Sequence, residues 1–501
     1  MKILSRKLMQ QYDKYTIEEI GIPGKTLMEN AGKNSAIFIN RRILSHPAKV
    51  ALFCSHGNNG GDGFVIARYL KKFGHEPIVF FVGKEEKMSP ETRENYELLK
   101  RYKIRVTKIP NYEIWQKFRN HLIDSDLIVD AIFGIGFHGI VKGWLAKLIG
   151  EVNQADKFVV AVDIASGIDA NTGFVDTAIR ADFTLTMAAF KYGHFLGKGR
   201  AYSGVVEVID IGIPPEVDTN FPPEASLITS QLVNYPQRSE CSHKGSFGKV
   251  GIIAGSEGYS GAAILSARSA LRAGAGLVYL FHPPGMENIF EPALIEPITI
   301  ALPEDDAQAI DLILKKSEQM NTLLIGPGIS LSDRTKLILS SVIKHSSCPL
   351  IIDADALNII AQQDELLTSL KDKNVVLTPH IGEFSRLSKT DISQIIADPL
   401  SHLRSFWDRF NVRVLLKSFT SIYYNGEHFY FNIRGNDGLA TGGSGDVLSG
   451  IITSFVAQNS DLDDAVIAAT YLLGITAEEI ACIRKPASII PIDIIENLFK
   501  Y

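Results

Sequence analysis

The sequence is poor in cysteine, and it lacks both a strong charge of one sign and a long apolar run. Its four cysteines stand far apart and form no CxxC pair: Cys54, Cys241, Cys348 and Cys482. This spacing argues against a zinc site or a disulfide framework and favours a reducing compartment. The formal net charge of -5 provides no basic field for nucleic acid or an anionic membrane.

No apolar run is long enough to span a bilayer, and no signal-peptide core follows the basic residues Lys2, Arg6 and Lys7. We therefore expect a cytoplasmic protein that binds neither membranes nor nucleic acid, and we expect a homo-oligomer. Hydrophobic residues make up 46% of the 501 residues and charged residues 21%. Such a chain is expected to fold into roughly two to four globular domains.

Short apolar runs alternate with amphipathic stretches in two series, which predicts two α/β units whose parallel sheets carry helices on both faces. The first series predicts strands at 50–53, 78–82, 127–132, 158–162, 183–187 and 205–209. The second predicts strands at 250–254, 277–281, 323–325, 350–352, 375–377 and 414–416, and an antiparallel pair at 421–424 and 428–431. Proline crowds residues 212–239 between the two series, so we predict domains at 1–225 and 226–501.

The sharpest local motif of the first series is Asn-Asn-Gly-Gly-Asp-Gly at residues 58–63, between a predicted strand and a helix expected at 64–73. A glycine-rich turn of this kind exposes backbone N–H groups at a helix N-terminus, where anions are favoured. Ligands also gather beyond the carboxyl ends of parallel strands. The asparagine oxygens could ligate a hard cation or hold a hydroxyl. A tight turn capped by Asp62 explains the same residues without a ligand.

Two further predicted strands end in polar residues. Asp130 closes one strand, and Asp163 and Ser166 follow the next. Together with Asn59, these strand ends would direct amide, carboxylate and hydroxyl oxygens into one crevice, which suits a hard monovalent or divalent cation. Each aspartate alone is more often a turn or cap residue, so the prediction depends on the three strand ends together.

The stretches NNGGDG, VDAIFGIGFHG and VDIASG, after GIPGKTLMENAG, resemble the NAD(P)H-hydrate epimerase family over about residues 1 to 225. The resemblance implies a Rossmann-like three-layer fold and a potassium ion held by Asn59, Asp130 and Ser166. It implies interconversion of the two C6 epimers of hydrated NADH or NADPH (NADHX and NADPHX). The implied contacts with the hydrated nucleotide are Asn58, Asn59, Gly60, Gly61, Asp62, Gly134, Ile135, Gly136, Phe137, His138, Gly139, Ile140 and Asp163. The family often has an acidic residue where this chain has Ile140, so that contact can only be main-chain.

Epimerisation at C6 requires proton transfer to and from the hydroxyl on that carbon. Asp163 is the acid/base that we expect. Lys191 is a second candidate, although a lone lysine near a strand end is more often solvated.

The densest motif of the second series is NDGLATGGSGD at residues 436–446, which runs into a helix expected at 444–456. Its glycines let the backbone approach a phosphate, and the first-turn N–H groups stabilise charge on a transferring phosphoryl group. Asp446 stands where a carboxylate could take a proton from an attacking hydroxyl. A carboxylate there is also a simple partner of the helix dipole, but the packed glycine pattern favours the catalytic interpretation.

Three other predicted strands of the second series end in glycine or acidic residues. Asp353 and Asp355 follow one strand and Glu383 follows the next, and these hard oxygen ligands could organise Mg²⁺ and phosphates. His380, after Pro379, is expected to contact a ligand, although a core histidine would explain it too.

Together with KGSFG, GPG, DADALN and TPHIGE, the GGSGD segment resembles the ADP- or ATP-dependent NAD(P)H-hydrate dehydratase family over about residues 230 to 501. The resemblance implies a ribokinase-like α/β fold and ADP as co-substrate. It implies hydrate contacts at Ala262, Gly328, His380 and Asp446. It implies nucleotide contacts at Lys417, Ser418, Phe419, Thr420, Ser421 and Gly445. Glycine usually occupies the position of Ser418 in the family, so the details of the nucleotide loop differ here.

The predicted protein is a bifunctional isomerase and lyase that repairs NADHX and NADPHX. Asp446 would deprotonate the C6 hydroxyl, which would attack the β-phosphate of ADP. Departure of the phosphate ester would then restore NAD(P)H and yield AMP and phosphate. The resemblance implies that only the S epimer is consumed, so that an epimerase supplies the R form.

Two alternatives stay open at this point. A ribokinase-like vitamin-precursor kinase would share the GGSGD loop but release a stable phosphorylated product. The first domain would then be a non-catalytic Rossmann-like binding module.

Overall fold

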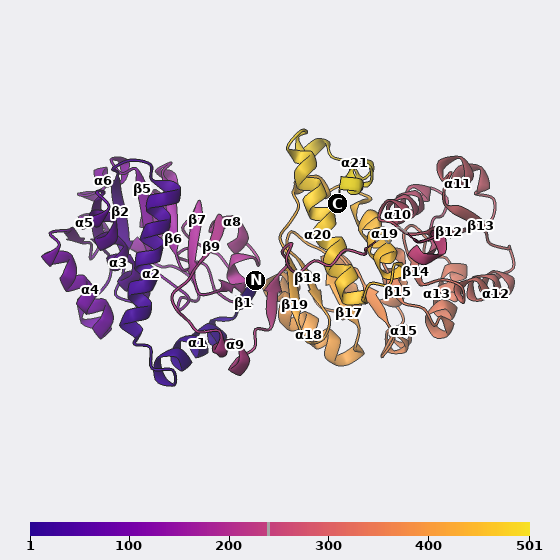
Figure 1. Ribbon diagram of the computed structural model, residues 1–501, viewed down its shortest axis with the longest axis horizontal. Helices are drawn as coiled ribbons and strands as arrows, with labels where there is room; N and C mark the ends of the chain where they lie inside the picture. Colours follow the sequence, from indigo (N-terminus) through magenta and orange to yellow (C-terminus); the bar gives the residue numbers. More distant parts are fainter. Residues whose placement is uncertain (238–240, 501) are drawn as a thin grey trace. The chain divides into compact units, whose positions relative to one another are not determined.

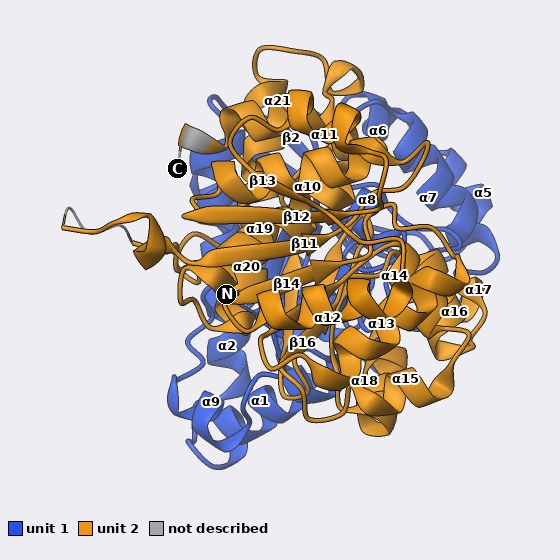
Figure 2. Ribbon diagram, turned by 90° about the vertical axis from the view of Figure 1, so that its right-hand side faces the viewer, with its two compact units in different colours: residues 1–225 blue, residues 226–501 orange. Residues whose placement is uncertain are grey.

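The computed structural model describes residues 1–237 and 241–500, which form two compact units (Figures 1 and 2). Unit 1 is Met1–Ala225 and unit 2 is Ser226–Tyr501. Within the described ranges, no helix combines the length and apolarity that crossing a bilayer requires.

Unit 1 is built on a parallel sheet of seven strands in the order β4-β3-β2-β5-β6-β7-β9. The strands are β2 (Lys49–Cys54), β3 (Glu76–Phe81), β4 (Arg105–Lys108), β5 (Leu127–Ala131), β6 (Phe158–Val162), β7 (Phe183–Met187) and β9 (Val205–Ile209). The six predicted strands are confirmed. Strand β4 was missed because Arg-Val-Thr-Lys is short and polar, and it pairs at the edge of the sheet beside β3.

Helices cover both faces of this sheet. On one face α2 (Gly24–Phe38), α3 (Asn58–Lys72) and α4 (Pro90–Arg101) share an apolar cluster with β2 and β5. On the other face α5 (Tyr112–Gln116), α6 (Asn120–Ile123) and α7 (Trp144–Gln154) pack around Trp115 and Leu148. The short helices α8 (Gly199–Ser203) and α9 (Glu216–Asn220) follow later in the chain. The predicted three-layer α/β architecture is confirmed.

Helix α3 begins at Asn58, so the NNGGDG segment lies inside the helix and not in a turn before residue 64. Glycine is unfavourable within helices, which explains the mistaken start. Packing requires it here: a Cβ on Gly60 would lie 1.9 Å from the carbonyl oxygen of Ser55. A Cβ on Gly63 would lie 2.6 Å from the Sγ of Cys54. The glycines therefore allow α3 to approach the end of β2.

The N-terminus of unit 1 folds back onto the end of the sheet. Strand β1 (Lys2–Leu4) pairs in parallel with β8 (Phe190–Lys191), and Leu4 stands opposite Lys191. Helix α1 (Arg6–Glu18) begins after Ser5, whose hydroxyl accepts a hydrogen bond from the Leu8 N–H at 3.1 Å. This segment is thereby anchored to the strand that carries Lys191.

Unit 2 contains a sheet in the order β13-β12-β11-β14-β15-β16-β17-β18-β19, parallel as far as β17 and antiparallel beyond it. The strands are β11 (Lys249–Ile253), β12 (Leu277–His282), β13 (Ile298–Ala301), β14 (Thr322–Ile325), β15 (Leu350–Ile352), β16 (Val375–Leu377), β17 (Arg413–Leu416), β18 (Ser421–Tyr424) and β19 (Phe429–Asn432). Strand β10 (Ala225–Leu227) lies at the boundary of the units. The predicted antiparallel hairpin is confirmed, whereas the short strands β10 and β13 were not predicted.

One face of this sheet packs against α10 (Ser260–Arg272), α19 (Ser444–Ala457), α20 (Leu462–Ala481) and α21 (Pro491–Asn497) in a single apolar cluster. Alternate strand residues such as Ile252 and Leu324 belong to it, whereas Ile253 and Ile325, which point the opposite way, are buried outside it. Both faces of the sheet are therefore covered. The remaining helices are α11 (Glu287–Ala293), α12 (Asp306–Ser317), α13 (Asp333–His345), α14 (Asp355–Ile360), α15 (Asp364–Ser369), α16 (Ile381–Ser388), α17 (Ile392–Ala397) and α18 (Pro399–Phe410).

Candidate active sites

A cavity of about 830 Å³ opens in unit 1 where β2, β5, β6 and β7 end. Because the strands are parallel, their carboxyl ends meet at this edge and bring residues distant in sequence together. Nine of the predicted contacts line the cavity: Asn58, Asn59, Asp62, Gly134, Ile135, Gly136, Phe137, His138 and Asp163. The sequence motifs thus converge on one space.

Four predicted contacts of the same motifs do not line this cavity. Gly60 and Gly61 are buried in the packing of α3, and a Cβ on Gly61 would lie 2.6 Å from the Cε of Met28. Gly139 has φ +87°, and Ile140 is 51% exposed. Gly60 and Gly61 therefore allow close packing of α3, and Gly139 allows a left-handed backbone, whereas the Ile140 side chain is largely exposed.

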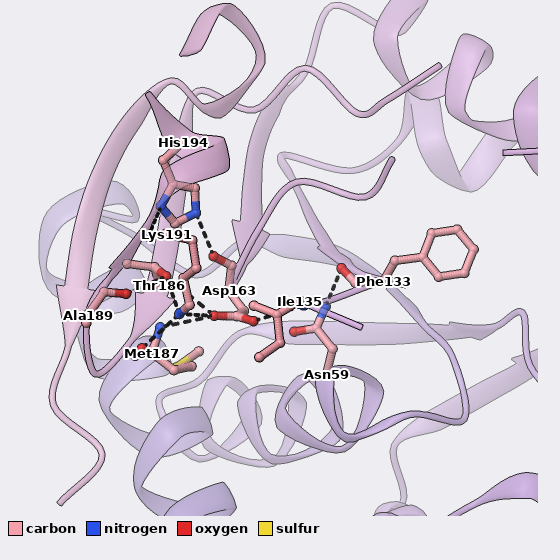
Figure 3. Close-up of polar contacts among 9 residues, drawn as sticks. All are labelled: Asn59, Phe133, Ile135, Asp163, Thr186, Met187, Ala189, Lys191 and His194. Carbon is pink, nitrogen blue, oxygen red and sulfur yellow. Dashed lines mark hydrogen bonds and ion pairs between the residues drawn. The ribbon is translucent and has the colours of Figure 1, made fainter. Parts of the chain in front are cut away.

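Asp163 sits at the end of β6 with a left-handed backbone, φ +67°. Its Oδ2 accepts from the Ile135 N–H at 3.3 Å (Figure 3). Its N–H donates to the Leu185 carbonyl at 2.7 Å. A non-glycine residue in this region costs about 1–3 kcal/mol and typically marks a functional position. Asp163 is therefore held in place by contacts from two neighbouring strand ends.

Lys191 is fully buried, whereas a lone lysine near a strand end is more often solvated. Its Nζ donates to Asp163 Oδ1 at 2.6 Å, to Thr186 Oγ1 at 2.8 Å and to the Met187 carbonyl at 2.9 Å (Figure 3). Burial alone would raise the pKa of Asp163, but the charge and hydrogen bond of Lys191 outweigh it and hold that pKa below its ordinary value. Asp163 is thus ionised at neutral pH.

His194 hydrogen-bonds to the backbones of both Lys191 and Asp163. Its Nδ1 accepts from the Lys191 N–H at 3.1 Å, so its Nε2 carries the hydrogen and donates to the Asp163 carbonyl at 3.0 Å. Burial and the charge of Lys191 lower the pKa of His194 to about 3. The imidazole is neutral at physiological pH and leaves Lys191 as the cation beside Asp163.

Two more carboxyl groups face this ion pair, Asp62 from α3 and Asp13 from α1. Burial raises the pKa of Asp13 to about 6, with Lys191 opposing and Asp163 adding to the shift. Burial and the charges of Asp163 and Asp13 raise the pKa of Asp62 well above its ordinary value. The sequence did not predict Asp13, because one polar residue in an amphipathic helix gives no signal of a ligand.

The three residues predicted to hold potassium lie together beneath the cavity. Asp130 accepts from the Ser166 hydroxyl at 2.6 Å and from the Ser166 N–H at 2.7 Å. The Ser166 hydroxyl accepts from the Phe133 N–H at 2.8 Å. The Asn59 amide donates to the Phe133 carbonyl at 3.0 Å (Figure 3). Asn59 Oδ1 is buried without a hydrogen-bond partner among the described residues. A buried carboxylate, an unpartnered amide oxygen and a backbone carbonyl fit a hard cation such as K⁺.

The second candidate site surrounds Asp446 in the first turn of α19, after Gly443 with φ +100°. Burial and the charge of Asp353 raise the pKa of Asp446 to about 7 against the opposing charge of Lys417. No residue in the described part of the chain hydrogen-bonds to this carboxyl. It can therefore exchange a proton near neutral pH.

Lys417 follows β17 and reaches the same helix start. Its Nζ donates to Asp353 Oδ1 at 2.7 Å and lies 3.1 Å from where a Cβ on Gly445 would stand. The next residues form the loop before β18, in which the Ser418 hydroxyl donates to the Thr420 carbonyl at 2.5 Å and Phe419 is 70% exposed. Ser418 thus closes the turn with its own side chain.

The predicted hydrate contacts of unit 2 come from two helices and two strand ends: Ala262 lies in α10, Asp446 in α19, Gly328 follows β14 and His380 follows β16. A Cβ on Gly328 would lie 3.2 Å from the Cβ of Ala262, so these two residues adjoin. His380 caps α16, where its Nδ1 accepts from the Gly382 N–H at 3.0 Å. Burial and the charge of Lys417 lower the pKa of His380, which is therefore neutral. His380 lies beside Lys417 through a parallel bridge between their backbones.

Asp353, Asp355 and Glu383, which the sequence indicated could organise Mg²⁺ and phosphates, each have a partner within the protein. Asp353 is paired with Lys417, Asp355 accepts from the Ser330 N–H at 3.0 Å, and Glu383 accepts from the His380 N–H at 2.8 Å. Over the ranges that the structure describes, no group of three or more His, Cys, Asp or Glu side chains could hold a metal ion. Each of the three carboxylates therefore already has a hydrogen-bond or ion-pair partner within the protein.

A second cavity, of about 560 Å³, lies beyond the ends of β11, β12 and β14. Ser256 lines it and donates through its hydroxyl to the Gly328 carbonyl at 2.8 Å, so this cavity adjoins the Gly328 turn. Its lining is mostly apolar or small, for example Gly255, Pro283 and Ile329, and gave no signal in the sequence.

The two site architectures define an enzyme with two α/β catalytic units. Residues 250–499 match the family model described as NAD(P)H-hydrate dehydratase, and residues 24–193 match the model described as YjeF-related protein N-terminus. A solved ribokinase-like superfamily protein from Enterococcus faecalis is 28% identical with a TM-score of 0.50. It covers 56% of this chain and 95% of its own. The predicted Rossmann-like and ribokinase-like folds are confirmed.

Two curated relatives match nearly the whole chain. One is the "Bifunctional NAD(P)H-hydrate repair enzyme Nnr" of Moorella thermoacetica, 35% identical over 99% of this chain and 96% of its own. The protein of the same name from Dictyoglomus turgidum is 34% identical over 95% of this chain and 93% of its own. The chain belongs to the family of bifunctional NAD(P)H-hydrate repair enzymes, as the resemblance predicted.

Proposed function

We propose that this chain repairs hydrated NADH and NADPH in two steps. Unit 1 interconverts the R and S epimers at C6, and unit 2 dehydrates the S epimer at the expense of ADP, with release of AMP and phosphate. Relatives with this name match both units. The observation that carries the proposal is the Asp446 carboxyl, which has a pKa of about 7 and stands beside Lys417 at a glycine-lined helix start.

The dehydratase step follows from leaving-group chemistry. Asp446 takes the proton of the C6 hydroxyl, and the oxygen attacks the β-phosphorus of ADP while AMP leaves. The N–H groups of residues 442–445 and the Lys417 ammonium stabilise the charge on the phosphoryl group. The C6–O bond then breaks with its electron pair on phosphate, the ring nitrogen forms a double bond to C6, and loss of a C5 proton to the departing phosphate restores the dihydropyridine.

The nucleotide is expected along the segment Lys417, Ser418, Phe419, Thr420, Ser421 and Gly445, and the hydrate at Ala262, Gly328, His380 and Asp446. Because the three neighbouring carboxylates form no metal cage, we expect Mg²⁺ to enter bound to the nucleotide phosphates, as it commonly does. The cytoplasmic location and a homo-oligomeric state stay predictions.

The epimerase step belongs to the cavity of unit 1. Asp163, ionised by Lys191, exchanges a proton with the C6 hydroxyl, and the cavity residues that line α3 and the loop after β5 hold the nucleotide. Asn59, Asp130 and Ser166, with the Phe133 carbonyl, would hold K⁺. When bound, K⁺ would supply the positive charge that the buried Asp130 carboxylate lacks.

The test uses the purified full chain with hydrated NADH, ADP and Mg²⁺, and follows the return of the dihydronicotinamide absorbance. We expect free phosphate and AMP as products, and loss of the reaction in Asp446→Asn. The exposed Asp437 of the same segment provides a matched control, Asp437→Asn, which should keep full activity. A stable phosphorylated alcohol in place of free phosphate would overturn the dehydratase and indicate a kinase.

A further inference from the structure

Helix α1 brings Asp13 into the epimerase cavity from outside residues 24–193, the range that the N-terminal family model matches. The helix is fixed at several points. The Tyr12 hydroxyl donates to Asp218 at 2.7 Å, the Arg6 guanidinium pairs with Asp169 at 2.9 Å, and the preceding strand pairs with β8. The position of Asp13 in the cavity is therefore set by the packing of the whole N-terminal segment.

The carboxyl of Asp13 is open to the cavity. It is half-buried, and no residue in the described ranges donates a hydrogen bond to it. Asp163 differs in this respect, because its oxygens accept from Lys191 and from the Ile135 N–H. Asp13 is thus free to contact a ligand hydroxyl, whereas Asp163 is the fixed anion.

The charges around Asp13 do not balance if every carboxyl is ionised. Asp13 on α1, Asp62 on α3 and Asp163 after β6 all face Lys191 on β8, the one ammonium among these four groups. The other titratable groups that line the cavity are His56, Glu91 and His138. One ammonium cannot neutralise three carboxylates that are at least partly withdrawn from water, so the cavity keeps protons on some of them.

Resting on the epimerase function proposed above, we propose that Asp13 is a second catalytic residue of unit 1, which donates a proton to the C6 hydroxyl, while Asp163 is the base that accepts a proton from the water that adds to C6. The two proton transfers at the C6 oxygen are thereby assigned to two carboxyl groups from different elements.

The step balances as follows. Protonated Asp13 gives its proton to the C6 hydroxyl oxygen, and the C6–O bond breaks with both electrons on the departing water. The lone pair of the ring nitrogen forms a double bond to C6. Water then adds to the opposite face of C6 and gives a proton to the Asp163 carboxylate, while the nitrogen recovers its lone pair. Proton transfer from Asp163 back to Asp13, through water, resets the site.

The environments of the two carboxyls push their protonation in opposite directions, which is the usual mark of an acid and base pair. Burial raises the pKa of Asp13 to about 6, and Lys191 holds the pKa of Asp163 below its ordinary value. A proton donor works best when its pKa lies near the working pH.

The experiment exploits the two activities of the full chain. With a mixture of epimers, excess ADP and Mg²⁺, absorbance returns in a fast phase from the S epimer and a slow phase limited by epimerisation of the R form. We expect Asp13→Asn to slow the second phase by about 100-fold or more, because general acid–base catalysis typically contributes a rate factor of at least this size. The rate of the fast phase should change by less than threefold. The KM of the epimerisation that limits the slow phase should also change by less than threefold.

The matched control is Glu18→Gln on the same helix, whose side chain is 58% exposed and lines no part of the cavity. It should leave both phases unchanged, and Asp13→Glu should restore part of the slow phase. A structural role would instead lower the melting temperature of Asp13→Asn and raise the KM, with no rescue by glutamate, and this result would overturn the proposal.

The failures of the two proposals are distinguishable. If the wild-type chain shows a slow phase no faster than spontaneous epimerisation, the epimerase function itself fails. If the wild-type slow phase is catalysed and Asp13→Asn keeps it within threefold, the function stands and the catalytic role of Asp13 is refuted.

Discussion

Replacing Lys191 by methionine should destabilise unit 1 through the charge that it leaves behind. The side chain is fully buried and donates to three oxygens, and its loss would strand the Asp163 carboxylate among them. Removing one partner of a buried ion pair typically costs about 3–5 kcal/mol. Lys191→Met should therefore lower the free energy of unfolding of unit 1 by about this amount. The double variant Lys191→Met/Asp163→Asn should recover most of it, because no buried charge remains.

The sign of the pH dependence provides a sharper test. In the wild type the pKa of Asp163 is lowered in the folded state, so its stabilising contribution is present above the unfolded pKa and is lost as pH falls through the folded one. Without Lys191, burial dominates and raises the pKa of Asp163. The contribution of Asp163 to the free energy of unfolding is then lost as pH rises. The loss of stability of Lys191→Met relative to the wild type should therefore be larger at pH 8 than at pH 5.

Urea unfolding followed by tryptophan fluorescence can isolate unit 1. In a Trp407→Phe background the two remaining tryptophans, Trp115 and Trp144, both belong to unit 1. The matched control is Lys198→Met, which removes an exposed lysine and should change stability by less than about 0.5 kcal/mol. The account of the buried pair would be refuted if Lys191→Met lowered the free energy of unfolding by less than about 1 kcal/mol at pH 8. It would also be refuted if the loss were equal at both pH values.

Three further predictions concern the two sites and the packing of α3. The dehydratase kcat should rise with pH through about 7, because Asp446 must be ionised to accept the proton, and a flat kcat profile from pH 5 to 9 would contradict this role. Asp446→Asn should lower kcat by about 10²–10⁴-fold. Asn59→Leu removes the unpartnered amide oxygen, so the melting temperature of unit 1 should rise with KCl over choline chloride in the wild type but not in the variant. Gly60→Ala would place a Cβ 1.9 Å from the Ser55 carbonyl and should destabilise unit 1 by about 1–3 kcal/mol in urea unfolding, whereas Gly136→Ala, with open space around its Cβ, should not.

The sequence by itself determined the α/β class, the central strands and the motifs that line the two sites. Buried parallel strands are apolar in every position, so runs such as 158–162 and 350–352 stand out without tertiary information. The carboxyl ends of parallel strands share one edge of a sheet, so Asn59 and Asp163 could be placed in one crevice from their positions after predicted strands.

The tertiary structure alone decided which polar groups are buried, paired or open to a ligand. The sequence left Lys191 as either a second acid/base candidate or a solvated lysine, and the tertiary structure buries it beside Asp163, on the strand β8 that pairs with the N-terminal strand. Asp13 entered the site only because α1 folds back over the sheet end, more than a hundred residues from Asp163 in the chain. Helix α3 begins within the glycines because their close approach to Ser55 outweighs their weak helix preference. Local patterns report the burial of a strand or helix face, whereas the protonation and availability of a side chain depend on neighbours that come from distant parts of the sequence.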